Sequence, residues 1–139
     1  MATFYGDNET IAQTANSFIR RGQFGGNKKV IYDTRTLVST DSSNANGSVF
    51  DFGDLPAGST LVGFTIYHEA MAASTTLAGA VGATTVVTAA GSTAIGSLSI
   101  NYAGVGLEVD TASTVTVTLA GAAATSGKSI KVVVEYVES

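Results

Sequence analysis

The chain of 139 residues has no cysteine, no tryptophan, one proline and one histidine. Without cysteine no disulfide can form, and a chain of this length buries roughly two-thirds of its unfolded surface, enough for one domain to fold unaided. A lone histidine without cysteine also lacks the companion ligands that a zinc site needs. The composition therefore predicts a fold that depends on no disulfide, metal ion or cofactor.

Charged residues are scarce in the middle of the chain. No lysine or arginine occurs from Thr36 to Gly127, and residues 70–107 carry no charge of either sign. Catalysis needs titratable groups with tuned pKa values, and binding to nucleic acid needs clustered basic side chains. A hydrolase would have to draw its acid and base from few carboxylates, which are those of Asp51, Asp54, Glu69, Glu108 and Asp110. We therefore expect a structural or binding module that is not an enzyme and whose main body binds no nucleic acid.

The uncharged stretch at 70–107 also bears on location and assembly. It is interrupted by glycines and rich in threonine, unlike a membrane-spanning helix. The N-terminus has neither the basic segment nor the apolar core of a signal peptide. We therefore expect a soluble protein, made in a cytoplasm and not bound to a membrane. Because so few charges suit full solvation poorly, the stretch also predicts a homo-oligomer.

The first 27 residues differ in pattern from the rest of the chain. A helical spacing of apolar residues occurs at Ile11, Ala15, Phe18 and Ile19. A glycine-rich stretch at 22–27 follows and is expected to act as a hinge. The sequence therefore predicts an arm over 1–27, extended or partly helical and with few contacts to its own domain, and a folded domain over 28–139.

Basic residues gather around this hinge. Five of the seven lie in the first quarter of the chain, at Arg20, Arg21, Lys28, Lys29 and Arg35. Pairs this short are typical of a solvated or partner-docking arm and fall short of a nucleic-acid patch. If the arm docks on a partner, we expect its contacts to come from Arg20, Arg21, Phe24, Lys28 and Lys29.

From residue 28 onward, apolar and polar residues alternate with a period of two. The predicted strands are Val30–Ser39, Ser48–Phe52, Leu61–His68, Thr84–Thr88, Ile95–Ile100, Thr114–Leu119 and Ile130–Val137. In the third of these, the alternation places Val62 on one face with Phe64 and Ile66. Turn clusters separate the runs at intervals of about ten residues, as in β-sandwiches and barrels. The pattern predicts an all-β, antiparallel β-sandwich, jelly-roll-like, with about eight strands.

Three short motifs fail as chemical sites. Ser126-Gly127-Lys128-Ser129 ends like a phosphate-binding loop, but position 122 is alanine and a strand follows where the loop needs a helix. The calcium-loop pattern at 42–53 lacks its first and last carboxylates. A weaker oxygen site for a cation, formed by Asp41, Asp51 and Asp54, stays open. His68 and Glu69 are adjacent in a strand and point to opposite faces, so we interpret His68 as a polar residue at the end of a strand.

Several segments together resemble a known family. They are the lysine-rich strand beginning at 28–34, the Phe50–Val62 segment with its Leu55-Pro56-Ala57-Gly58 turn, Leu77-Ala78-Gly79, and the Thr-Val alternation before the final strand. In this order they resemble small β-rich virion proteins of tailed bacteriophages, of the capsid decoration or cement type. The resemblance identifies no contact residues.

The resemblance implies a non-enzymatic protein on the exterior of a capsid. It implies that the protein reinforces the capsid, binds the major capsid protein and is commonly a homotrimer. Two other functions stay open from the sequence. The chain is alternatively another virion component, such as a tail, head-closure or fibre-base protein, or a cellular carbohydrate-binding β-sandwich.

Overall fold

The computed structural model describes residues 3–5 and 28–138. The helical pattern at 8–21 and the hinge at 22–27 lie outside these residues. Within them the chain forms nine strands and one turn of 3-10 helix. The strands are β1 (Thr3–Tyr5), β2 (Lys28–Leu37), β3 (Val49–Leu55), β4 (Ser59–His68), β5 (Thr76–Val81), β6 (Thr84–Gly91), β7 (Gly96–Ser99), β8 (Ser113–Ala120) and β9 (Lys128–Glu138).

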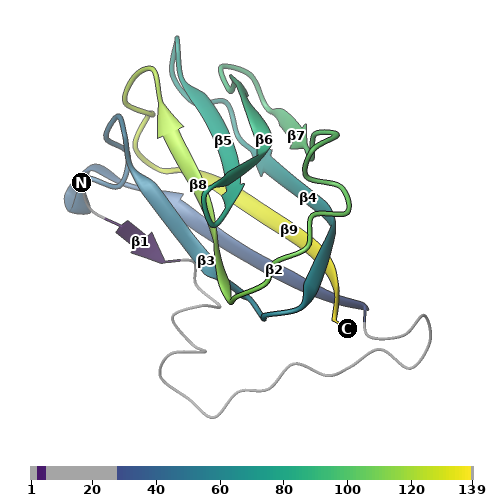
Figure 1. Ribbon diagram of the computed structural model, residues 1–139. Coiled ribbons are helices and arrows are strands. Elements are labelled where there is room, and N and C mark those ends of the chain that lie inside the picture. Colours follow the sequence, from purple (N-terminus) through teal and green to yellow (C-terminus); the bar gives the residue numbers. More distant parts are fainter. Residues whose placement is uncertain (1–2, 6–27, 139) are drawn as a thin grey trace.

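The strands form two facing sheets (Figure 1). One sheet has the order β1-β3-β8-β5-β6 and the other the order β2-β9-β4-β7. All bonded pairs among β2 to β9 are antiparallel. Among these eight strands only β5 and β6 are neighbours both in sequence and in a sheet. The first of the eight, β2, pairs with the last, β9. The predicted antiparallel β-sandwich is confirmed, and its jelly-roll-like connectivity stays a prediction.

The period-two pattern of the final strand explains how the core forms. In β9, alternate residues from Ile130 to Tyr136 are buried, and the residues between them face outward. Side chains of both sheets meet in one apolar cluster that includes Phe50, Phe52 and Phe64. Because each large apolar side chain contributes about 1.5–3 kcal/mol on full burial, this cluster holds the two sheets together.

The beginning of β4 departs from the predicted alternation. The pairing of β4 with β9 shifts register between Leu61 and Gly63, which marks a β-bulge. As a result Leu61 is fully buried with Phe64, whereas Val62 is 38% exposed. The prediction that Val62 shares the core face of Phe64 is wrong, because a bulge adds one residue to the strand and reverses the alternation before it.

Strand β5 was not among the predicted strands. Its sequence, TLAGAV, is rich in alanine and glycine, yet its burial alternates like that of the other strands. A Cβ on Gly79 would lie 3.0 Å from two atoms of the Phe64 ring and 3.1 Å from a methyl group of Val87. Gly79 therefore lets the Phe64 ring pack directly on the backbone of β5.

The start of the chain is attached to the sandwich. Strand β1 pairs in parallel with β3, placing Phe4 beside Phe50 with their ring centroids 5.8 Å apart. The Arg35 guanidinium of β2 lies 5.2 Å from the centroid of the Phe4 ring and forms an ion pair with Asp41. The expectation of few contacts between the arm and its domain is therefore wrong for residues 3–5, because the apolar Phe4 packs on the core.

Candidate functional site: the outer face of the four-stranded sheet

Two of the five predicted contact residues lie in the described part of the chain, and Arg20, Arg21 and Phe24 lie outside it. Lys28 and Lys29 begin β2, and their ammonium groups have different surroundings. Lys28 Nζ lies 3.2 Å from Glu135 Oε2, in a pair whose side chains are 52% and 40% exposed. Lys29 Nζ lies 3.1 Å from Glu138 Oε1, where the side chains are only 11% and 19% exposed. Lys28 is thus open to a partner, whereas Lys29 is largely enclosed by its own domain.

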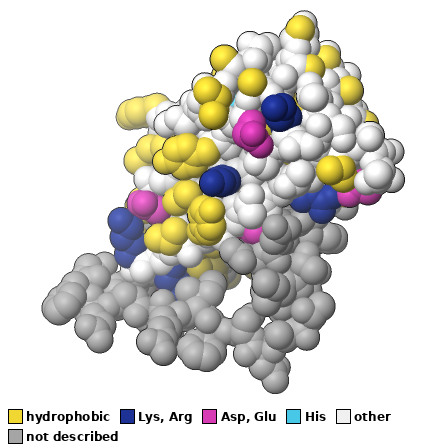
Figure 2. All heavy atoms as spheres, turned by 180° about the vertical axis from the view of Figure 1, so that it is seen from behind, with side chains coloured by type: hydrophobic (Ala, Val, Ile, Leu, Met, Phe, Trp, Pro, Cys, Tyr) yellow, Lys and Arg dark blue, Asp and Glu magenta, His cyan; other side chains and the backbone are white. Residues whose placement is uncertain are grey.

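Exposed apolar side chains gather on the outward side of β2, β9, β4 and β7, which we call the outer face. Val30 and Tyr32 of β2 and Tyr67 of β4 are each about half exposed, and Val62 of β4 is 38% exposed. Figure 2 looks onto this side and shows hydrophobic side chains interrupted by few charged ones. Because isolated exposed apolar residues are ordinary but a gathered set is not, this face is the candidate interaction surface.

The register of the strands sets which side chains stand side by side on the outer face. One row runs from Tyr32 through Val133 and Thr65 to Ser99. The next row runs from Thr34 through Lys131 and Tyr67 to Ser97. Directly opposed side chains on one face are in contact range, so each row acts as a continuous strip. The pairing of β2 with the distant β9 creates these rows.

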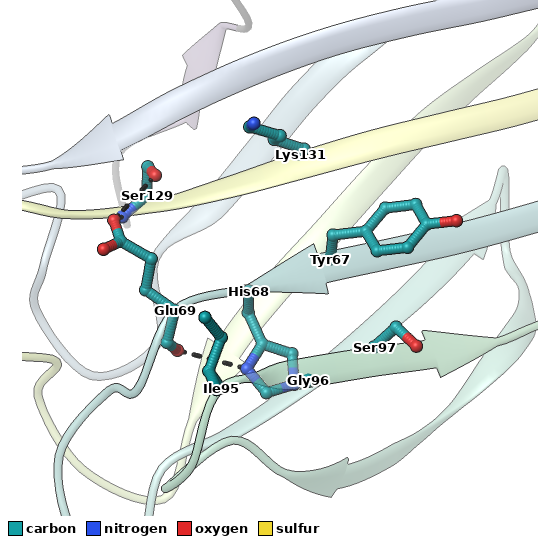
Figure 3. Close-up of a pocket in the computed structure, with 8 residues that line it drawn as sticks. All are labelled: Tyr67, His68, Glu69, Ile95, Gly96, Ser97, Ser129 and Lys131. Atoms are coloured by element: carbon teal, nitrogen blue, oxygen red, sulfur yellow. Dashed lines mark hydrogen bonds between the residues drawn. The ribbon is translucent and has the colours of Figure 1, made fainter.

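A groove lies at one end of the outer face, with a volume of about 380 Å³. Figure 3 shows its residues, which come from the end of β4, the start of β7 and the start of β9. They are Tyr67, His68, Glu69, Ile95, Gly96, Ser97, Ser129 and Lys131. The groove contains the one histidine of the chain and both members of the His68-Glu69 pair.

Three hydrogen bonds fix the polar groups of the groove. Ser129 donates from its backbone nitrogen and its hydroxyl to Glu69 Oε1, at 2.9 and 2.8 Å. These bonds, the side-chain bond foremost, hold the pKa of Glu69 below its ordinary value. His68 Nδ1 lies 3.1 Å from the Glu69 carbonyl oxygen, so Nδ1 donates this bond and Nε2 takes no part in it. His68 indeed ends β4, as predicted, and is 6% exposed.

Two of the three aspartates of the suggested cation site, Asp41 and Asp51, engage other partners. Asp41 accepts from the Ser43 nitrogen and pairs with Arg35, and the Ser43 bonds lower the pKa of Asp41. Asp51 accepts from the Gly53 nitrogen, and burial raises its pKa. Within residues 3–5 and 28–138, no three His, Cys, Asp or Glu side chains are grouped so that they could hold a metal ion. The same residues include no helix long and apolar enough to cross a membrane.

The fold of this chain is similar to that of chains from two phage capsids. No protein-family model matches the chain, and no curated protein matches it significantly. Two solved structures share the fold. A chain from the capsid of Ralstonia phage GP4 superposes with a TM-score of 0.73 at 17% identity, covering 99% of both chains. A chain from the capsid asymmetric unit of cyanophage Pam1 superposes with a TM-score of 0.54 at 24% identity, covering 91% of this chain and 96% of the other.

Proposed function

We propose that the protein is a non-enzymatic structural component of a bacteriophage virion, which decorates the exterior of the capsid and stabilises it as a cement protein. The observation that carries the proposal is the match of fold over 99% of both chains with a chain of a phage capsid. A match that covers nearly all of both chains favours a shared role more than a local likeness does. The low charge of residues 70–107 supports the same role.

The outer face is the part of the described surface best suited to the major capsid protein. It offers half-exposed tyrosine and valine side chains, and aromatic residues are enriched where protein interfaces bury their centres. The exposed Lys28–Glu135 pair lies beside Val30 and adds charged groups to this face. We propose that this face rests on the capsid, with the major capsid protein as partner.

A different flank suits contacts between copies of the chain, which we propose form a homotrimer. Strands β6 and β7 are the edges of the two sheets, lie on the same side of the sandwich (Figure 1) and belong to the uncharged stretch. Natural edge strands are usually protected by charges or proline, and the eight residues of β6 have neither. Several linked copies would bind a repeating lattice more tightly than one, because each further contact is intramolecular.

The arm over 1–27 remains part of the proposal as a tether beside the domain over 28–139. Exposed charge contacts to an acidic capsid surface would come from Arg20, Arg21, Lys28 and Lys29. Phe24 would add an apolar contact. We expect Lys28 to contribute more than Lys29, because the Lys29 ammonium is already enclosed with Glu138.

The test is sedimentation of the purified protein with capsids that lack it. The protein should pellet with these capsids and raise the temperature at which they open. Tyr32→Ser should weaken binding, whereas Thr125→Ala, at an exposed loop position outside the outer face and outside β6 and β7, should leave it unchanged. Pelleting with separated tails but not with heads would refute the decoration role and favour another virion component.

A further inference from the structure

The groove at the end of the outer face carries an inference that can be tested on the isolated protein, without a capsid. It is concave, and its volume of about 380 Å³ lies near the lower end of the range of about 300–1,000 Å³ found for small-molecule sites. A groove of this size fits a small ligand better than a strand or helix of a protein partner. The groups that line it define the chemistry of that ligand.

The polar groups of the groove include both donors and acceptors. Lys131 offers an ammonium group and has no ion-pair partner in the described part of the chain. Glu69 has one carboxylate oxygen committed to Ser129, and its other oxygen remains a second acceptor in the groove. One positive and one negative side chain cancel, so the groove favours a neutral ligand that both donates and accepts hydrogen bonds.

His68 adds a ring nitrogen to this set. The residue is 6% exposed, and the bond between Nδ1 and the Glu69 carbonyl oxygen leaves Nε2 as the nitrogen that a ligand can bond. A Cβ on Gly96 would lie 3.8 Å from both Cε1 and Nε2 of the ring. Glycine at position 96 therefore places no side chain against this edge of the ring, and Figure 3 shows Gly96 beside the ring. A larger side chain there would close it.

Apolar surface completes the groove. The Tyr67 ring is 48% exposed and stands between Lys131 and Ser97 in its row, and Ile95 is 78% exposed. An aromatic face bordered by hydrogen-bonding groups matches a ligand that has C–H surface on one side and hydroxyl groups at its edge. We propose that the groove binds a neutral saccharide, with the sugar ring packed on Tyr67 and its hydroxyl groups bonded to His68, Glu69 and Lys131.

The test uses the full chain and a panel of four sugars, namely glucose, galactose, mannose and N-acetylglucosamine, each titrated at millimolar concentrations. Backbone amide shifts are followed by NMR. At least one sugar should produce saturable shifts at Tyr67, Gly96 and Lys131, and none of the four should do so at strand β3, which belongs to the other sheet. If no sugar of the panel shifts the groove amides, the proposal is wrong.

Matched variants separate binding in the groove from a general surface effect. Tyr67→Ala should weaken sugar binding about tenfold, the upper range for loss of one aromatic contact. Tyr32→Ala removes a tyrosine of similar exposure from the same face outside the groove and should leave binding unchanged. Gly96→Val should abolish binding with the fold intact by circular dichroism, because its Cβ meets only ordinary contacts. Equal loss in Tyr67→Ala and Tyr32→Ala would overturn the assignment.

Discussion

Leu61→Ala and Val62→Ala test the β-bulge at the start of β4. Regular alternation would place Val62 in the core and Leu61 outside, whereas the structure places them the other way round. Regular alternation therefore predicts that Val62→Ala destabilises the fold more than Leu61→Ala, whereas the bulge predicts the reverse. The pair also changes adjacent positions of the same strand, so local effects on the backbone are similar.

The magnitude follows from burial. Leu61 is 0% exposed, and removing a buried leucine side chain costs about 2–5 kcal/mol through lost transfer energy and the cavity that remains. Val62 is 38% exposed, and substitutions at such surface positions usually change stability by less than about 0.5 kcal/mol. The expected difference between the two variants is thus at least about 1.5 kcal/mol.

The assay is urea unfolding followed by far-UV circular dichroism, at one protein concentration so that association affects all variants equally. With a slope of about 1–3 kcal/mol per molar urea, Leu61→Ala should lower the midpoint by about 1–2 M. Val62→Ala should move it little. An equal shift in both variants, or a larger one in Val62→Ala, would refute the bulge and restore regular alternation.

Two further predictions concern β5 and the groove. Gly79→Ala should lower the free energy of unfolding by about 1–3 kcal/mol in the same assay, because the new methyl group would press on Phe64 and Val87; unchanged stability would contradict this packing. Ser129→Ala should raise the pKa of Glu69 toward 4.5, as read by NMR titration of its carboxyl group. Since the pKa of Glu69 is lower in the folded than in the unfolded state, its ionised carboxylate stabilises the fold above the unfolded pKa, and this stabilisation is lost as pH falls through the folded pKa. Below about pH 4.5 the wild type should therefore lose more stability than Ser129→Ala. Equal acid sensitivity of the two proteins would contradict the bond.

Local alternation was sufficient to predict the strands that bury one face and carry strong side chains. In β9, Ile130 to Tyr136 alternate with polar or exposed residues, and β8 repeats threonine and valine. Such strands need no partner to be recognised, because the pattern itself separates a core face from a solvent face. The class of fold followed from their number and from the turns between them.

Tertiary structure alone decided the features that depend on contact between distant segments. Gly79 in β5 is explained by the Phe64 ring of β4, and β1 is held by Phe50 and Arg35. The bulge at Leu61 exists only relative to β9. None of these partners is near in sequence, so no local pattern could reveal them.

The same distinction applies to the candidate sites. The sequence alone determined a β-rich domain with an uncharged stretch over 70–107 and with most of the basic residues of the chain near its start, because composition and periodicity are properties of the chain itself. The outer face and the groove arise when β2 and β4 pair with β9 and β7 pairs with β4, bringing residues 95–97 beside His68 and Lys131. Strand pairing over long sequence distances is set by the packing of the whole sandwich, and only the folded structure shows which side chains it brings together.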